Sequence, residues 1–233
     1  MAILLTIQQK IPQMTMLKTE LLAPAGSLEV IYPAVRMGAN AVYLGADIFS
    51  ARGNAGNFNR EQLLEAVKYC HARNVAVHLA CNTLIHDDEM ESALNLIKYA
   101  CEIGIDAIII QDIGLVSLIR KAAPNMTLHA STQMSVHTAE AAKMLYDMGF
   151  ERVVLARELS KTEIKEIADK LKSMNCPIEL EVFVHGALCM SVSGQCYMSA
   201  MLGGRSGNRG LCAQPCRLPF NACLLYTSDA ADE

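Results

Sequence analysis

Four cysteines in one short glycine-rich stretch are the residues of this sequence best suited to metal chemistry. The spacings between them are six, fifteen and three residues, and the four are Cys189, Cys196, Cys212 and Cys216. Thiolates are soft ligands that hold iron–sulfur clusters or zinc. Structural zinc sites usually use tight cysteine pairs. The irregular spacing therefore favours an iron–sulfur cluster, of the 4Fe-4S type, with zinc as the alternative.

The loop between the second and third of these cysteines carries two arginines on a flexible backbone. It runs from Gly203 to Gly210 and contains Arg205 and Arg209. Guanidinium groups and backbone N–H groups bind carboxylates and phosphates. We therefore predict that Arg205 and Arg209 bind substrate; on composition alone, a solvated linker is an equally good interpretation.

The composition excludes several classes of protein. The chain has 233 residues, of which 52% are hydrophobic, with a net charge of −4, so it is not a disordered chain or one that coats nucleic acid through bulk charge. No apolar run is long enough to cross a bilayer, and no signal peptide is evident. We expect a cytoplasmic protein without membrane contact, whose thiols stay reduced. Four further cysteines fall in periodic segments and are expected to be small buried hydrophobes: Cys70, Cys81, Cys101 and Cys176.

Helical and apolar segments alternate along the chain. We predict seven strands, at Glu20–Ala23, Ala41–Leu44, Val75–Cys81, Ala107–Ile110, Thr127–Ala130, Arg152–Leu155 and Ile178–Val184. Six helices lie between them, at Leu28–Met37, Arg60–Arg73, Asp88–Ile103, Leu115–Ala123, Thr138–Met148 and Lys161–Met174. This order predicts an α/β fold, a TIM-type (β/α)8 barrel over residues 17–188 that is incomplete, with about seven strands. A doubly wound sheet is the alternative. The cysteine-rich segment, residues 189–222, follows strand seven.

Barrel enzymes place their chemistry at the carboxyl ends of the strands. Polar residues gather at those ends here, and together they indicate a polar pocket. We predict catalytic roles for Arg157, Glu158, His129 and His185, and substrate binding by Asn54, Asn82 and Gln133. Further polar residues at the same ends are Asp47, Arg52, Asn57, Gln111, Asp112 and Ser131. For a lone Asn or Asp, a helix cap or a satisfied loop residue is the better interpretation.

One long motif links the chain to a known family. The segment Glu181–Ser199 has the pattern Glu-x-Phe, two residues, Gly-Ala-Leu-Cys, four residues, Gly-x-Cys-x-Met-Ser. It resembles the signature of peptidase family U32. Further blocks that resemble the family are Glu20–Gly26, Gly38–Tyr43, His129–Gln133 and Leu155–Leu159, so the resemblance covers roughly Leu17 to Phe220.

The resemblance implies an iron–sulfur-dependent hydroxylation of transfer or ribosomal RNA, with prephenate as a small carboxylate cosubstrate. Cys189, Cys196 and Cys212 would bind the cluster, and the fourth ligand would be Cys216 or a cysteine beyond the end of this chain. The cosubstrate would be held by Arg157, Arg205 or Arg209. The run Gly203–Gly210 is most similar to the long, ribosomal-RNA-type branch.

Two other functions remain open. The first is a protease, as the family name suggests, although the sequence has no His-Glu-x-x-His zinc helix and no Gly-x-Ser-x-Gly elbow. The second is a non-catalytic scaffold whose C-terminal loop is stabilised by zinc or a cluster.

Both ends of the chain are interpreted as foreign to the family. Residues 223–233 resemble a translated sequencing adapter, so we expect the natural protein to continue past about Asn221. Residues 1–16 are interpreted as a non-native leader, with Met14 or Met16 as the true start.

Overall fold

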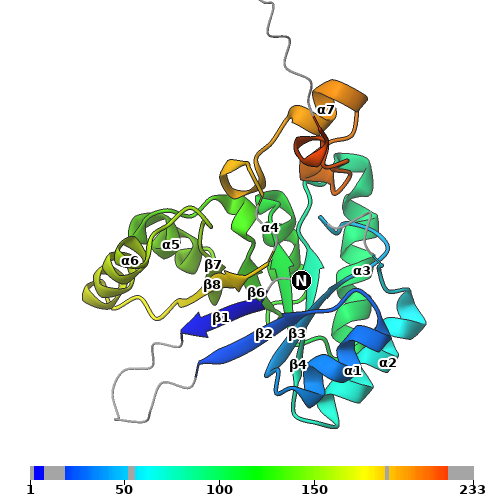
Figure 1. Ribbon diagram of the computed structural model, residues 1–233. Helices are drawn as coiled ribbons and strands as arrows, with labels where there is room; N and C mark the ends of the chain where they lie inside the picture. The colour runs from blue at the N-terminus through cyan, green and yellow to red at the C-terminus, as the bar shows by residue number, and fades with distance from the viewer. Residues whose placement is uncertain (1–2, 8–18, 52–55, 187–188, 220–233) are drawn as a thin grey trace, which may run out of the picture.

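A barrel of eight strands forms the body of the protein (Figure 1). The computed structural model describes residues 3–7, 19–51, 56–186 and 189–219. The strands follow one another around the barrel in chain order: β1 (Ile3–Ile7), β2 (Glu20–Pro24), β3 (Ala41–Gly45), β4 (Ala76–Cys81), β5 (Ala107–Ile110), β6 (Thr127–Ala130), β7 (Arg152–Val154) and β8 (Glu179–His185). Strands β2 to β8 are parallel, and β1 closes the barrel by pairing antiparallel with both β2 and β8.

Six helices alternate with the parallel strands: α1 (Leu28–Arg36), α2 (Arg60–His71), α3 (Met90–Ile103), α4 (Ile113–Ala122), α5 (Ala139–Asp147) and α6 (Lys161–Ser173). A short helix, α7 (Met198–Gly203), lies among the cysteines. Local sequence sets the helix ends. Asn59 and Ser160 begin α2 and α6 with reciprocal capping boxes, and Gly104 ends α3 in the left-handed conformation, at φ 84°. Among the described residues, no helix is long and apolar enough to cross a membrane.

The strands present different chemistry to the two sides of the barrel wall. Residues such as Leu79, Cys81, Ile108 and Ile110 belong to the main core that the helices cover. Because side chains alternate along a strand, the intervening positions face the barrel interior. There a second apolar cluster is built on Leu22, Ala41 and Val154. The inward rows end, at the carboxyl side of β4, β5 and β6, on the polar residues Asn82, Gln111 and Ser131.

The seven strands expected from the sequence are confirmed as β2 to β8, within two residues at each end. The sequence analysis gave no strand to residues 3–7, which form β1. These residues are Ile-Leu-Leu-Thr-Ile, a run with high strand propensity, and pairing with two neighbours satisfies the backbone groups of the barrel edges. That residues 1–16 are a non-native leader stays a prediction, and the adapter-like tail 223–233 lies outside the described residues.

The scattered cysteines were predicted to be buried. Cys70, Cys81 and Cys176 are buried, but the prediction is wrong for Cys101, which is exposed. Helix α3 packs against the barrel through Ala93, Leu96, Ile97 and Ala100, which places Cys101 on its outer side.

Candidate functional site

Residues 189–219, here called the cap, lie at the carboxyl end of the barrel, in orange to red at the top of Figure 1. The Nε2 atom of Gln195 donates to the carbonyl oxygen of Gln133, after β6, at 2.6 Å. The N–H of Leu84, after β4, donates to the carbonyl oxygen of Asn208 at 3.3 Å. Gly210 packs so closely on the loop after β3 that a Cβ would overlap the carbonyl oxygen of Ser50. The cap therefore bridges loops from several barrel strands.

Arg209 fastens the cap to the loop before α3. Its Nη1 and Nη2 atoms donate to the two carboxylate oxygens of Glu89 at 2.7 and 2.6 Å, and Nη1 also reaches the carbonyl oxygen of Leu84. Hydrogen bonding to Arg209 lowers the pKa of Glu89 to about 2. Arg209 was predicted to bind substrate; because these contacts occupy its guanidinium, the structure assigns it to holding the cap. Arg205 donates from Nε to the carbonyl oxygen of Leu211, inside the cap.

Glu158 anchors the other side of the cap. Its carboxylate accepts hydrogen bonds from the backbone N–H and the hydroxyl of Ser193, and His137 Nε2 lies 3.6 Å from its Oε2 atom. Burial alone would raise the pKa of Glu158, but its backbone contacts, those of Ser193 and the nearby His137 lower it. Ser193 is fully buried and bonded to a carboxylate rather than to a histidine, so these three residues do not form a Ser-His-Asp type triad. Glu158 was predicted to be catalytic, and the contacts shown here are structural.

In three of the four cap cysteines, the sulfur forms a hydrogen bond with the residue two positions later in the chain. The N–H of Met198 donates to Cys196 Sγ at 3.4 Å, and the N–H of Gln214 donates to Cys212 Sγ at 3.3 Å. Cys189 Sγ lies 3.1 Å from the hydroxyl of Ser191. Donors of this kind stabilise thiolates and tune the potentials of iron–sulfur clusters. Each of these three sulfurs therefore has a polar contact within its own turn.

Arg157, after β7, adds positive charge beside Cys189. Partial burial would raise the pKa of this thiol, but hydrogen bonds from Ser191 and the hydrogen bond and charge of Arg157 together lower it. The buried Cys70 and Cys81 show the opposite, since burial raises their pKa values to about 11 and about 12. The Cys189 thiol is thus distinguished from the cysteines of the core.

Two of the cap cysteines, Cys196 and Cys212, lie close together. The Cβ position of Gly207 is 3.7 Å from both the carbonyl oxygen of Cys196 and the Cβ of Cys212, so these two cysteines are neighbours. Cys216 is exposed on the turn after Cys212. Over the described part of the chain, no three His, Cys, Asp or Glu side chains converge as a single metal ion requires. A cluster makes a different demand, because each thiolate binds a different iron atom. Four cysteine thiols are the donors that such a cluster would need.

Several polar atoms near the mouth are buried and have no hydrogen-bond partner within the described part of the chain. They are Gln111 Oε1, Gln133 Oε1, Arg157 Nε and Asn208 Oδ1. The three amide side chains are each at least nine-tenths buried. Leaving such groups unpaired costs free energy, so their clustering at one end of a barrel is typical of a binding site. The sequence analysis predicted Gln133 and noted Gln111, but it missed Asn208, whose only signal was an amide inside a glycine-rich loop.

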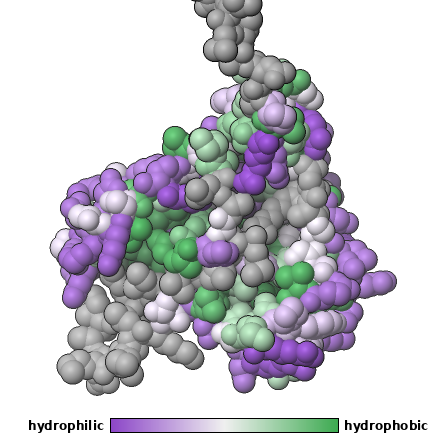
Figure 2. Space-filling model, in the orientation of Figure 1, coloured by the Kyte–Doolittle hydropathy of each residue, from purple (hydrophilic) through white to green (hydrophobic). Residues whose placement is uncertain are grey.

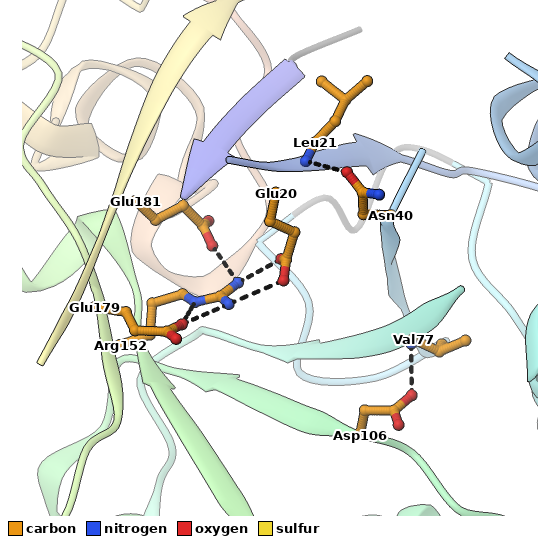
Figure 3. A network of polar contacts seen from close by, with 8 residues as sticks. All are labelled: Glu20, Leu21, Asn40, Val77, Asp106, Arg152, Glu179 and Glu181. Carbon is orange, nitrogen blue, oxygen red and sulfur yellow. Dashed lines mark hydrogen bonds and ion pairs between the residues drawn. The ribbon is translucent and has the colours of Figure 1, made fainter. Parts of the chain in front are cut away.

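The other predicted site residues that the structure describes are Asn82, His185 and His129. Asn82 accepts a hydrogen bond from the N–H of Ala51 at 3.0 Å, and His185 is exposed at the end of β8. Asn54 lies outside the described residues. His129 was expected at the mouth, but it is an inward residue in the middle of β6, buried edge-to-face against His78 at 4.8 Å between ring centroids. It shares the amino-terminal half of the barrel with Arg152, which binds Glu20, Glu179 and Glu181 (Figure 3).

Comparison with known proteins identifies the family. The model of Peptidase family U32 matches residues 26–233, most of the chain. The chain belongs to peptidase family U32. The U32 chain is 43% identical over 203 residues to a 23S rRNA 5-hydroxycytidine C2501 synthase of Escherichia coli, covering 87% of this chain and 30% of that protein. It is 37% identical over 215 residues to tRNA hydroxylation protein P1 of Bacillus subtilis, covering 92% of this chain and 49% of that protein.

A third relative carries a protease name. It is a collagenase of Porphyromonas gingivalis, 36% identical over 205 residues, with 85% of this chain and 49% of that protein covered. The chain thus spans about half the length or less of these curated relatives. A solved structure of a U32 peptidase has the same fold, with a TM-score of 0.54 over 69% of this chain and 68% of that one, at 14% identity.

Proposed function

We propose that this U32 chain is the barrel of a cluster-dependent enzyme that hydroxylates a nucleoside of ribosomal or transfer RNA in the cytoplasm. Relatives that align with most of the chain are named for ribosomal RNA 5-hydroxycytidine synthesis and for tRNA hydroxylation. The observation that carries the proposal is the cap itself: Cys196 and Cys212 receive N–H donors at sulfur, and Cys189 lies beside Arg157, all above the barrel mouth.

In this proposal Cys189, Cys196, Cys212 and Cys216 hold an iron–sulfur cluster of the 4Fe-4S type. The bound cluster would supply the redox chemistry of hydroxylation. The contacts of Ser191, Met198 and Gln214 orient three of the sulfurs. Arg209 and Glu158 fix the cap on the barrel, and the cluster therefore stays over the mouth.

The unpaired polar atoms beneath the cap provide a place for the cosubstrate. Arg157 Nε is a buried donor without a partner, and the amides of Gln111, Gln133 and Asn208 are uncommitted at their oxygens. A guanidinium binds a carboxylate, and the amides pair with hydroxyl or carbonyl groups. A small hydroxy acid such as prephenate fits this set. Arg157 takes this role in place of Arg209, which is held by Glu89.

The cap also offers a surface for RNA. It contains three arginines and no aspartate or glutamate, within a chain of net charge −4. Large apolar side chains are exposed on it, including Tyr197 at 72% and Met201 at 84%. Figure 2 shows hydrophobic and hydrophilic residues intermingled at the top of the molecule, where the cap lies. Unpaired bases stack on aromatic and apolar side chains while arginines contact phosphates.

Iron content and RNA modification test the proposal together. We would purify the full-length natural protein without oxygen and measure its iron, sulfide and zinc, beside Cys189→Ser and Cys212→Ser variants and the matched control Cys101→Ser. Bound iron and sulfide should be lost from the two cap variants and retained by Cys101→Ser. A deletion strain complemented with the same genes should lack the hydroxylated nucleoside only with the cap variants, as read by mass spectrometry of ribosomal and transfer RNA. Iron-free natural protein, or cap variants that match Cys101→Ser in both measurements, would refute the proposal.

Proteolysis is the second candidate, favoured by the collagenase relative. The described residues offer it one serine–glutamate–histidine group, in which Ser193 is buried and faces the carboxylate. Gelatin cleavage by the purified protein that persists in the Cys189→Ser variant would establish a peptidase independent of the cluster. Absence of cleavage beside restored RNA hydroxylation would exclude it.

A further inference from the structure

A separate pocket opens at the amino-terminal end of the barrel, at the end opposite the cap. Its volume is about 360 Å³, and it lies at the beginnings of β5 to β8. The lining residues include three carboxylates, two imidazoles and one guanidinium: Asp106, Glu151, Glu179, His78, His129 and Arg152. Nothing in the proposed function uses this pocket.

The guanidinium in the wall has no capacity left for a ligand. Arg152 makes five contacts to carboxylates: Nε to Glu179, Nη1 to Glu20 and Glu181, and Nη2 to Glu20 and Glu179 (Figure 3). An arginine carries five N–H donors, so all are in use. Three carboxylates surround one positive charge, and Asp106 and Glu151 add two more at the pocket. The wall is therefore anionic, and an acidic ligand is excluded.

The two imidazoles of the pocket are a second, independent observation that points to a bound ligand. His78 and His129 are each 3% exposed, they line the pocket, and the Nδ1 atom of each has no partner among the described residues. Burial and the charge of Arg152 lower the pKa of His78 to about 4, and burial, His78 and Arg152 lower that of His129. Both rings are therefore neutral at pH 7, and a neutral imidazole can both accept and donate a hydrogen bond. Buried Nδ1 atoms that have no partner within the described ranges are typical of a polar binding site.

We propose that this pocket binds a small organic cation, an alkylammonium or guanidinium compound, between the carboxylates of Glu151, Glu179 and Asp106 and the two buried imidazoles. Its N–H groups would donate to carboxylates and imidazole nitrogen. A metal ion fits poorly, since nowhere in the described residues do three suitable ligands converge. The volume of the pocket suits a ligand that ranges in size from a few heavy atoms to a small metabolite. The site is independent of the RNA chemistry at the other end of the barrel.

Calorimetric titration of the full-length protein with putrescine tests the proposal, at constant ionic strength. We expect saturable binding of one putrescine per chain. Glu151→Gln should weaken it about three- to tenfold, because an anionic contact is lost. The side chain of Glu151 is exposed, so this variant keeps the fold. Glu166→Gln, on the outer side of α6, is the matched control and should bind as the parent does.

Three results would overturn the proposal. One is the absence of saturable putrescine binding. Another is equal affinity in Glu151→Gln and Glu166→Gln. The third is binding of magnesium chloride with displacement of putrescine at every concentration, which would make the site one for a metal ion.

Discussion

Replacing Arg152 with methionine should cause the largest loss of stability of any single change considered for this barrel. The Arg152 side chain is 5% exposed and holds Glu181, which is 1% exposed, together with Glu20 and Glu179. Burial alone would lower the pKa of Arg152, but hydrogen bonds and charges of the three carboxylates raise it. Removing one partner of a buried ion pair costs about 3–5 kcal/mol, because the other charge is left uncompensated. Methionine retains the apolar stem, so the loss reports on the charge.

Urea unfolding followed by circular dichroism measures this loss. With a denaturant slope of about 3 kcal/mol per molar, the midpoint should fall by about 1–1.7 M. Lys165→Met is the matched control, since it breaks the exposed pair with Asp169, whose side chains are 75% and 64% exposed, and its midpoint should not move measurably. The double variant Arg152→Met/Glu181→Gln should recover part of the loss, because it removes one uncompensated charge. If Arg152→Met unfolds at the same urea concentration as Lys165→Met, the charge network does not hold the barrel and the reasoning fails.

Three further predictions concern the helix ends, the cap and the thiols. Ser160→Ala removes the capping box of α6 and should lower the free energy of unfolding by about 1 kcal/mol in the same urea assay. An unchanged midpoint would contradict the role of this capping box. Hydrogen bonding to Arg209 lowers the pKa of Glu89 to about 2. The stability that the Arg209–Glu89 ion pair contributes is therefore complete above pH 4.5 and is lost as the pH falls from 4.5 towards 2. Hydrogen exchange of residues 203–219, corrected for intrinsic rates, should accelerate as the pH falls over that range in the parent protein and be fast throughout in Glu89→Gln. Identical profiles would show that the Arg209–Glu89 ion pair does not hold the cap. Iodoacetamide should label Cys101 in the folded protein and Cys81 only on unfolding, since burial raises the pKa of Cys81 to about 12; peptide mass spectrometry showing early labelling of Cys81 would count against the packing described.

The elements of the barrel were accessible from sequence because each has a strong local signal. Buried parallel strands such as Ala107–Ile110 are continuous apolar runs, and Ser160 with Glu163 marks a helix start unambiguously. The closure of the barrel by β1 could not be predicted from the sequence. Strand β1 gains its place by pairing with two strands distant in sequence, β2 and β8, and its five residues carry no periodicity that distinguishes a strand from an apolar leader.

The site was predictable by residue type and only partly by role. The sequence indicated that the cap cysteines and Arg157 belong together, and Cys189 lies beside Arg157. The internal contacts of Arg209 could not be predicted, because a guanidinium on a flexible loop has the same sequence pattern whether its partner is a ligand or an internal carboxylate. Its partner, Glu89, is distant in sequence and is also a normal residue for a helix start. His129 was misplaced by half a strand, since a polar residue within a short strand cannot be assigned to the middle or the end without its pairing register.

The architecture of the cap gives a physical reason for the irregular cysteine spacing. Between Cys196 and Cys212 the chain forms α7, returns beside Cys196 at Gly207, binds Glu89 through Arg209 and packs Gly210 on Ser50 before it reaches Cys212. Fifteen residues are needed to reach the loops after β3 and β4 and come back, whereas a tight cysteine pair would bind metal without touching the barrel. The spacing therefore couples the position of Cys212 to the barrel loops. A thiolate set attached in this way is held over the polar mouth of Gln111, Gln133 and Arg157, where a ligand bound below and a metal bound above would meet.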